Sequence, residues 1–182
     1  MKISTTEIEG VLIVEPKVFG DSRGFFMETY KKSVFEGFGL GKEFVQDNHS
    51  RSQKGVLRGL HYQLNPHPIA KLVRVVGGEV FDVGVDIRRG SKTFGKWFGG
   101  VLSSENKKMF YFPSGFAHGF YALTDGAEVL YKCTGEYHPG SERGLIWNDP
   151  KVAISWPIQD GIVHLNEKDK LHPGIDKIET NF

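Results

Sequence analysis

The sequence predicts an all-β protein, and most specifically a jelly-roll barrel. Short apolar runs of strand length recur along the 182 residues, and turn chemistry such as Gly77-Gly78 and Asp125-Gly126 separates them. The chain also holds 14 Phe and 23 Gly, which favour strands and tight turns. An immunoglobulin-like sandwich is the less favoured alternative. So many strands in one small unit leave fewer exposed edges when the sheet closes or doubles into a jelly roll.

Ten strands and two minor helical segments are expected. The strands cover residues 11–14, 24–30, 44–49, 56–62, 71–76, 80–87, 97–102, 109–112, 119–123 and 127–133. Ser33 and Glu36 have the spacing of a capping box that opens a short helix. Residues 166–169 are expected to start a helical turn near the end of the chain.

Length and composition exclude several classes of protein. A chain of this length is expected to form one jelly-roll domain over residues 1–182. The 23 basic and 22 acidic residues leave a net charge of +1, which disfavours nucleic acid as a partner. No apolar run approaches the roughly 20 residues of a membrane span, so no membrane partner is expected. One cysteine and an opening without signal-peptide character predict a cytoplasmic setting.

The strand at 80–87 alternates with a period of two. Phe81, Val83, Val85 and Ile87 share one face, and we expect this face to pack between the sheets. Asp82 and Asp86 lie on the other face. That face points either to solvent or into a polar cavity inside the barrel.

The densest polar stretch is 46–52, followed by 57–63. Buried polar groups without partners cost about 1–3 kcal/mol each, so a bound ligand is one explanation and a solvent-facing strand is the other. Among the seven histidines, His61 is the best candidate for a general base at neutral pH. Five other histidines are expected to have structural roles, namely His49, His67, His138, His164 and His172.

His118 ends the tight turn Pro113-Ser114-Gly115-Phe116-Ala117-His118, which resembles the second motif of cupins, where the histidine often binds a metal. The first cupin motif usually supplies two histidines one residue apart and a glutamate. The corresponding stretch here is His61-Tyr62-Gln63, with a single histidine. We therefore expect no metal.

Two further side chains stand out by their phase. Lys71 is in phase with Val73 and Val75 and against Leu72 and Arg74, so one of the two faces of this strand takes a cation among apolar residues. An inward Lys71 would need an anion such as an enolate or a phosphate. Tyr131 is in phase with Val129 and Cys133, and a buried phenol seeks a hydrogen-bond partner.

Five ordered motifs together resemble the dTDP-4-dehydrorhamnose 3,5-epimerase family, over about residues 3–170. They are Asp21–Phe26, Gln46–Ser50, Gly55–Gln63, Pro113–Phe120 and Trp147–Pro150. The resemblance implies a jelly-roll isomerase that needs no cofactor and acts as a homodimer. It also implies the third step from glucose 1-phosphate to dTDP-L-rhamnose, in which a dTDP-4-dehydro sugar is epimerised at carbons 3 and 5.

The same resemblance assigns the site residues. His61 corresponds to the proton acceptor, Tyr131 to the proton donor and Lys71 to the cation near the keto oxygen. Asp169, or alternatively Asp82, would pair with His61. Tyr137 corresponds to the residue that stacks on thymine. The other substrate-binding positions are Arg23, Glu28, Gln46, Asp47, Asn48, Arg58, His118, Glu142 and Lys168. The motif around Arg23 and Glu28 is expected to act on the second subunit's site.

One geometric condition must hold. In a regular strand Arg58 and His61 point to opposite faces, so a shared site requires a bulge or bend at Gly59-Leu60. The competing hypotheses are an epimerase acting at one carbon, a 3,4-ketoisomerase, a non-catalytic sugar-nucleotide binding module and a metal-dependent cupin.

Overall fold

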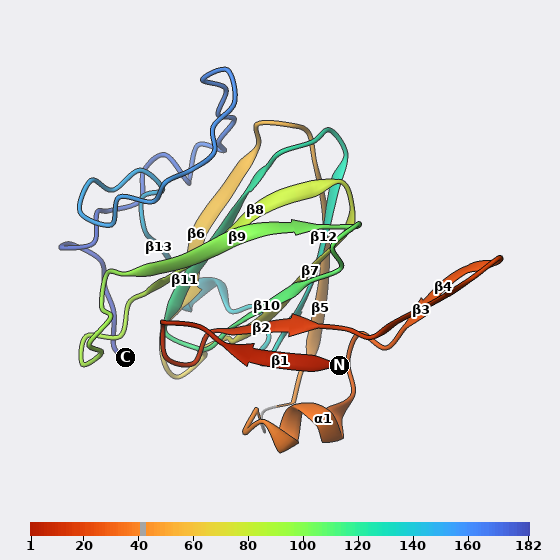
Figure 1. Ribbon diagram of the computed structural model, residues 1–182. Helices are drawn as coiled ribbons and strands as arrows, with labels where there is room; N and C mark the ends of the chain where they lie inside the picture. The colour runs from red at the N-terminus through yellow and green to blue at the C-terminus, as the bar shows by residue number, and fades with distance from the viewer. Residues whose placement is uncertain (41–42) are drawn as a thin grey trace.

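Two antiparallel β-sheets face each other in the computed structural model, which describes residues 1–40 and 43–182 (Figure 1). The six-stranded sheet has the order β1-β2-β10-β7-β12-β5, the five-stranded sheet has the order β13-β6-β11-β8-β9, and β3 and β4 form a separate hairpin. The strands are β1 (Lys2–Thr5), β2 (Leu12–Glu15), β3 (Val18–Asp21), β4 (Gly24–Met27), β5 (Gln46–Ser52), β6 (Leu57–Gln63), β7 (Lys71–Gly77), β8 (Glu79–Asp86), β9 (Trp97–Ser103), β10 (Met109–Phe112), β11 (Phe116–Ala122), β12 (Ala127–Cys133) and β13 (Glu142–Gly144). The predicted all-β class is confirmed.

Each of the ten predicted strands is present, with ends shifted by a few residues. The largest shifts are at β4, which ends at Met27 rather than Tyr30, at β5, which runs on to Ser52, and at β11, which begins at Phe116. Three strands were not predicted, namely β1, β3 and β13. They are only three or four residues long, and polar residues or glycine make up most or half of each, so no apolar run marks them.

The predicted capping box is wrong. Helix α1 (Lys32–Gly37) begins one residue before Ser33, and its N-cap is Lys31, whose side chain makes no capping hydrogen bond. Packing stabilises the helix instead, because Phe35 is buried and its ring lies 5.1 Å from that of Tyr30. A short 3₁₀ helix covers Pro139–Ser141. Residues 166–169 form part of a turn and no helix.

The described core has three parts: one inside the sheets, one on the outer face of the five-stranded sheet, and one where Phe35 of helix α1 packs with Leu72 and Met109 of the six-stranded sheet. Val73, Val80, Phe110 and Val129 belong to a cluster that both sheets share. Val83, Val85 and Ile87 belong to another, which also includes Val152, Ile175 and Ile178 of the irregular C-terminal segment. The expectation that the Val83 face packs between the sheets is therefore wrong: the C-terminal segment covers this face.

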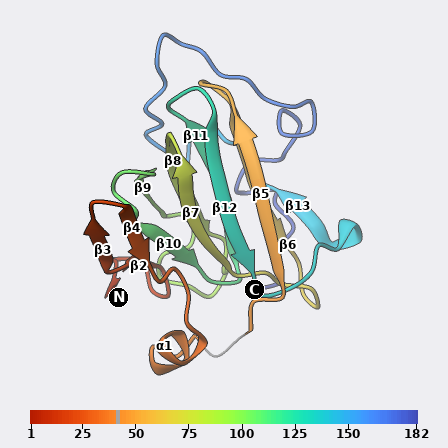
Figure 2. The ribbon, with the colours of Figure 1, turned by 90° about the vertical axis from the view of Figure 1, so that its right-hand side faces the viewer.

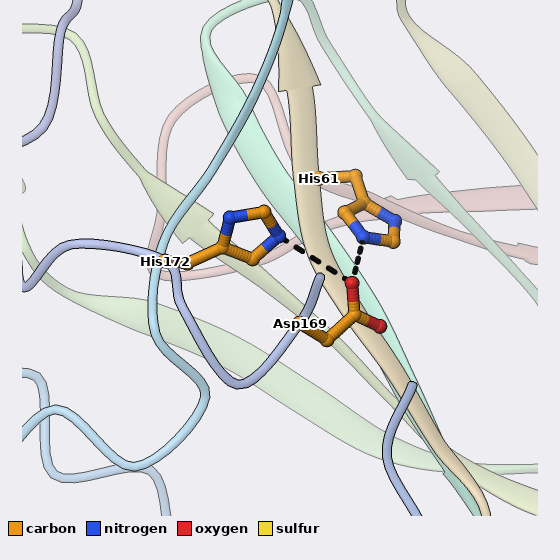
Figure 3. A group of neighbouring side chains, drawn as sticks. All are labelled: His61, Asp169 and His172. Atoms are coloured by element: carbon orange, nitrogen blue, oxygen red, sulfur yellow. Dashed lines mark hydrogen bonds and ion pairs between the residues drawn. The ribbon is translucent and has the colours of Figure 1, made fainter. Parts of the chain in front are cut away.

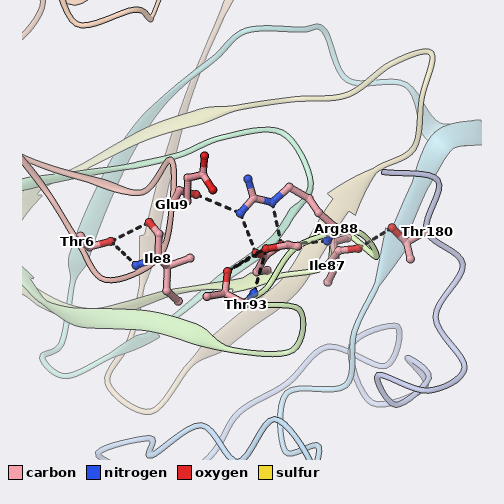
Figure 4. Close-up of polar contacts among 9 residues, drawn as sticks. Thr6, Ile8, Glu9, Ile87, Arg88, Thr93 and Thr180 are labelled. Atoms are coloured by element: carbon pink, nitrogen blue, oxygen red, sulfur yellow. Dashed lines mark hydrogen bonds and ion pairs between the residues drawn. The ribbon is translucent and has the colours of Figure 1, made fainter.

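The opposite face of β8 carries the two aspartates inward. Asp82 is fully buried between the sheets. Asp86 accepts hydrogen bonds from the Arg88 guanidinium and from the hydroxyls of Ser91 and Thr93 (Figure 4). Burial raises the pKa of Asp86, but these hydrogen bonds outweigh it and lower the pKa overall. Asp86 therefore stabilises the loop after β8, whereas Asp82 is left for the interior between the sheets.

Two remaining features bear on function. The β3–β4 hairpin projects from the body of the chain and exposes Phe19, Phe25 and Phe26 (Figure 1). Within residues 1–40 and 43–182, no helix combines the length and apolar character needed to cross a bilayer.

Candidate active site

Figure 2 shows β5, β7 and β12 on one side and β6 and β11 on the other. A polar cavity lies between these strands. It has two adjoining lobes of about 130 and 200 Å³. Three of the predicted catalytic side chains, His61, Lys71 and Tyr131, line both lobes. The position where the lobes meet is therefore the place for a reacting group.

A β-bulge brings Arg58 and His61 to the same lobe. Phe120 pairs with Arg58 and His118 with His61, so Gly59 and Leu60 together lie opposite the single residue Gly119. The backbone φ of Gly59 is +122°, and a Cβ there would lie 2.7 Å from the Gly119 Cα. Only glycine fits this position. The predicted irregularity is confirmed.

His61 is paired with Asp169, and Figure 3 shows their arrangement. The Nε2 of His61 lies 2.6 Å from the Asp169 Oδ1, while the Gly59 N–H donates to the Asp169 Oδ2 at 3.1 Å. Burial raises the pKa of Asp169, but His172, His61 and the Gly59 N–H outweigh it, so the pKa lies well below its ordinary value. Asp169 is therefore an anion that orients His61 and leaves the other ring nitrogen, Nδ1, free to accept a proton. Of the two predicted aspartates, Asp169 is the partner.

Asp82 instead pairs with the second site histidine. The Nε2 of His118 lies 2.8 Å from the Asp82 Oδ1, and the His118 Nδ1 is 3.5 Å from the Lys71 Nζ. Burial lowers the pKa of His118, so the ring is neutral near pH 7. With its proton directed to Asp82, the ring presents Nδ1 as an acceptor to the Lys71 ammonium. Burial also lowers the pKa of Lys71, although the negative charge of Asp82 partly opposes this.

Tyr131 lies on the wall opposite His61. It extends from β12 of the six-stranded sheet, whereas His61 extends from β6 of the five-stranded sheet. The Lys71 Nζ is 5.8 Å from the centroid of the Tyr131 ring. Burial raises the pKa of Tyr131, so its hydroxyl keeps its proton at neutral pH. A flat molecule between the sheets would thus meet a base on one face and a proton donor on the other.

Polar residues surround the rim of the smaller lobe. The Tyr137 hydroxyl donates to the Glu142 Oε2 at 2.8 Å, and Lys168 forms an ion pair with the same carboxylate. The Tyr137 N–H donates to the Gln46 Oε1 at 2.8 Å, and the Gln46 Nε2 donates to Asn48 at 3.0 Å. The Tyr137 ring is half exposed, which leaves one surface of the ring open for stacking.

Three predicted binding residues lie outside this cavity. Asp47 points away from it, on the outer face of the six-stranded sheet, where it accepts from Lys132 at 2.9 Å. Arg23 is exposed on the β3–β4 hairpin and pairs with Asp21 at 2.7 Å. Glu28 directly follows the hairpin. A single chain therefore does not bring these residues to His61.

His172 is a site neighbour that the sequence analysis took as structural. Its Nε2 is 3.4 Å from the Asp169 Oδ1, and its ring lies edge-on to that of His61 (Figure 3). The spacing of Asp169 and His172, three residues apart in one turn, is the signal that could have indicated this proximity.

Known proteins resemble the chain over almost its whole length. Residues 5–177 match the family model described as dTDP-4-dehydrorhamnose 3,5-epimerase. The dTDP-4-dehydrorhamnose 3,5-epimerases of Shigella flexneri and Escherichia coli K12 are 58% and 54% identical, over 93% of this chain and 93% and 92% of those proteins.

A solved structure shows the same likeness. The crystal structure of dTDP-6-deoxy-D-glucose-3,5-epimerase from Legionella pneumophila, in complex with dTDP-4-keto-L-rhamnose, is 51% identical and has a TM-score of 0.94, covering 98% of this chain and 94% of that one. This agreement confirms the predicted cupin-like fold. The chain belongs to the dTDP-4-dehydrorhamnose 3,5-epimerase family.

Proposed function

We propose that the chain carries out its family's reaction with His61 as the base and Tyr131 as the acid. The substrate is dTDP-4-dehydro-6-deoxy-D-glucose, which is inverted at carbons 3 and 5 to dTDP-4-dehydro-L-rhamnose in dTDP-L-rhamnose biosynthesis. One observation carries this assignment: His61 and Tyr131 line the same cavity from opposing sheets, and Lys71 lines it beside both.

The chemistry requires this arrangement. The 4-keto group acidifies the C–H bonds at both neighbouring carbons, and the same enolate oxygen serves both. The His61 Nδ1 removes the proton from one face, while the Asp169 carboxylate stabilises the imidazolium that forms. Tyr131 donates a proton from the other face, which inverts the carbon. Such acid or base assistance contributes about 10²–10⁴-fold in rate.

Lys71 stabilises the enolate oxygen. Its ammonium is buried beside both catalytic side chains, and a positioned cationic donor in a site of this kind lowers the barrier by about 3–4 kcal/mol. His118, held by Asp82, accepts one N–H of Lys71 and directs the other two toward the cavity. We therefore assign Asp82 and His118 to the positioning of Lys71.

The nucleotide end of the substrate binds at the rim. Tyr137 stacks on the thymine, and Gln46 and Asn48 supply hydrogen bonds. Arg58 and Lys168 supply charge-assisted hydrogen bonds to the diphosphate. Glu142 holds both Tyr137 and Lys168 in place.

A second subunit completes the site. The β3–β4 hairpin carries Arg23 away from its own cavity and exposes three phenylalanines that need a partner. We place this hairpin over the cavity of the other subunit in a homodimer. Mixing an Arg23→Ala chain with a His61→Asn chain then restores roughly a quarter of the activity under random pairing, since half the dimers have one intact site of two. No restoration would show that each chain is self-sufficient.

Deuterium incorporation tests the catalytic assignment. The purified protein is incubated with dTDP-4-dehydro-6-deoxy-D-glucose in heavy water with a chelator, and deuterium is located in the sugar by NMR. Label at carbons 3 and 5, lost in His61→Asn, supports the assignment. Label at one carbon would indicate a mono-epimerase. Binding without label would indicate a sugar-nucleotide binding protein.

A further inference from the structure

We propose that His61, Asp169 and His172 form an inhibitory site for a divalent transition-metal ion such as Zn²⁺. The inhibition part of this inference rests on the proposed role of His61 as the base, whereas the binding part does not. The residues differ from those of a cupin metal centre, since His118 is occupied by Asp82 and lies outside this group.

The donor atoms already lie at nearly the separation that a metal needs. One ligand atom from each of the three residues lies within 4.8 Å of the other two. The Asp169 Oδ1 is 2.6 Å from the His61 Nε2 and 3.4 Å from the His172 Nε2. Donors at Zn–N and Zn–O distances of about 2.0–2.2 Å are ~3.4 Å apart in a tetrahedral site. The Asp169–His172 separation already has this value, and the His61 Nε2 has to move away from Asp169 by about 0.8 Å to reach it.

His172 supplies the second, independent observation. Its side chain is only 9% exposed, and the contact of its Nε2 with the Asp169 Oδ1, at 3.4 Å, does not meet hydrogen-bond geometry (Figure 3). A buried ring nitrogen held by one long contact is poorly satisfied, and a ligand in line with its lone pair would satisfy it better. The His172 ring packs directly against Gly144. A Cβ at residue 144 would lie 2.3 Å from the ring atoms, so only glycine leaves room for the ring.

The carboxylate is arranged to bind an ion with one oxygen. The Gly59 N–H holds the Asp169 Oδ2, so the Oδ1 faces both histidines. Imidazole nitrogens combined with one carboxylate suit zinc and its first-row neighbours far better than magnesium.

Metal binding at this position would prevent His61 from accepting a proton, without filling the cavity. An ion on the Nε2 requires a neutral imidazole ring, whose proton then resides on the Nδ1, the nitrogen that must be empty to accept a proton from the substrate. The ion would lie on the Asp169 and His172 side of His61, at the edge of the larger lobe, whereas Lys71, Tyr131 and the rim remain accessible. The geometry therefore points to an inhibitor that lowers kcat and leaves KM unchanged.

The test uses the full chain in chelator-free buffer. Zn²⁺ binding is measured by titration calorimetry, and kcat and KM are measured in parallel with Zn²⁺, Mg²⁺ or neither. His172→Phe keeps the ring volume and removes both nitrogens, and His172→Gln checks that any change does not come from misfolding. His49→Gln is the matched control, because the His49 Nε2 is 3.0 Å from Glu128 in a surface pair that belongs to no group of three such ligands within residues 1–40 and 43–182.

We expect one Zn²⁺ per wild-type chain, a lowered kcat with unchanged KM, full recovery with a chelator and no effect of Mg²⁺. Both His172 variants should weaken Zn²⁺ binding by at least the ~10–100-fold that follows loss of a supporting partner at a metal site. His49→Gln should bind as wild type does. Wild-type affinity in the His172 variants, inhibition through a raised KM, or no Zn²⁺ binding would overturn the inference. Binding that depends on His172 but leaves kcat unchanged would overturn the inhibition and count against His61 as the base. The deuterium experiment with His61→Asn tests that assignment separately.

Discussion

Two histidine–aspartate pairs face the same cavity, and they differ in what surrounds them. In the first pair the side chain of His61 is 28% exposed and its Nδ1 is free. In the second pair His118 is 6% exposed, and its Nδ1 is directed at Lys71. Both aspartates are almost completely buried. The same chemical pair therefore has a free basic nitrogen in one place and an occupied one in the other.

The two histidines have different roles because their Nδ1 atoms, which do not contact the aspartates, have different surroundings. An imidazole backed by a carboxylate becomes a base only where its other nitrogen is open to substrate. Where that nitrogen instead meets an ammonium, the pair fixes the position of a cation. Four experiments can break or sharpen this comparison.

The largest expected difference is between the two histidines. His61→Asn should lower kcat by about 10²–10⁴-fold, because it removes the base. His118→Asn should cost only ~10–100-fold, equivalent to one hydrogen bond to a charged group. Steady-state kinetics on the dTDP-4-dehydro sugar measures both. Equal losses in the two variants would contradict the separation of roles.

Gly59 connects the two pairs, so its substitution should damage both. Its N–H donates to Asp169, and an added Cβ would lie 2.9 Å from the His118 carbonyl oxygen. Gly59→Ala should lower kcat and cost about 1–3 kcal/mol of unfolding free energy, measured by urea denaturation. Gly37→Ala is the control, because its Cβ would meet nothing within 4 Å. A Gly59→Ala protein as stable and active as wild type would show that the bulge is not needed.

The His118–Asp82 pair, which contacts Lys71, should affect the pH dependence of kcat/KM. Lys71 must be protonated to stabilise the enolate, so activity falls as pH rises through its pKa, which burial lowers. The Asp82 carboxylate opposes that lowering, and Asp82→Asn should therefore move the alkaline limb of kcat/KM to lower pH. The displacement should be smaller than the ~1–3 units that a charge in direct contact causes. Lys71→Arg should move the limb to higher pH, because guanidinium stays charged. An alkaline limb that neither variant moves would exclude Lys71 as its origin.

The smallest effect is expected outside the cavity. Asp47 pairs with Lys132 on the outer face of the six-stranded sheet. Asp47→Ala should change stability by no more than ~0.5 kcal/mol and leave kcat/KM close to wild type. A large rise in KM would mean that Asp47 reaches substrate in the assembled protein.

Local pattern was sufficient for much of the fold and site. Alternation placed Tyr131 on an interior face, and the opposite pointing of Arg58 and His61 in a regular strand predicted the bulge at Gly59-Leu60. For Lys71, alternation left open which face of its strand points inward. Pattern could not decide which aspartate meets His61, because Asp169 is 108 residues away in sequence. That pairing depends on where the irregular C-terminal segment lies against the sheet.

The same segment explains the misassigned face of β8. Alternation shows that Val83 and Asp82 lie on opposite faces, but it does not show which face looks into the barrel. The apolar face is covered by Val152, Ile175 and Ile178, which belong to no strand. A segment without regular secondary structure has no hydrophobic periodicity, so the sequence pattern does not predict that it covers a sheet.

The central claim is that His61 and Tyr131 act on opposite faces of one enolate. The most direct test is to incubate Tyr131→Phe with the dTDP-4-dehydro sugar in heavy water and to determine both deuterium content and configuration at carbons 3 and 5. With the acid removed and the base intact, the account predicts deuterium at both carbons with the original configuration retained. Inversion at the wild-type rate, or no deuterium while the sugar nucleotide still binds, would contradict it.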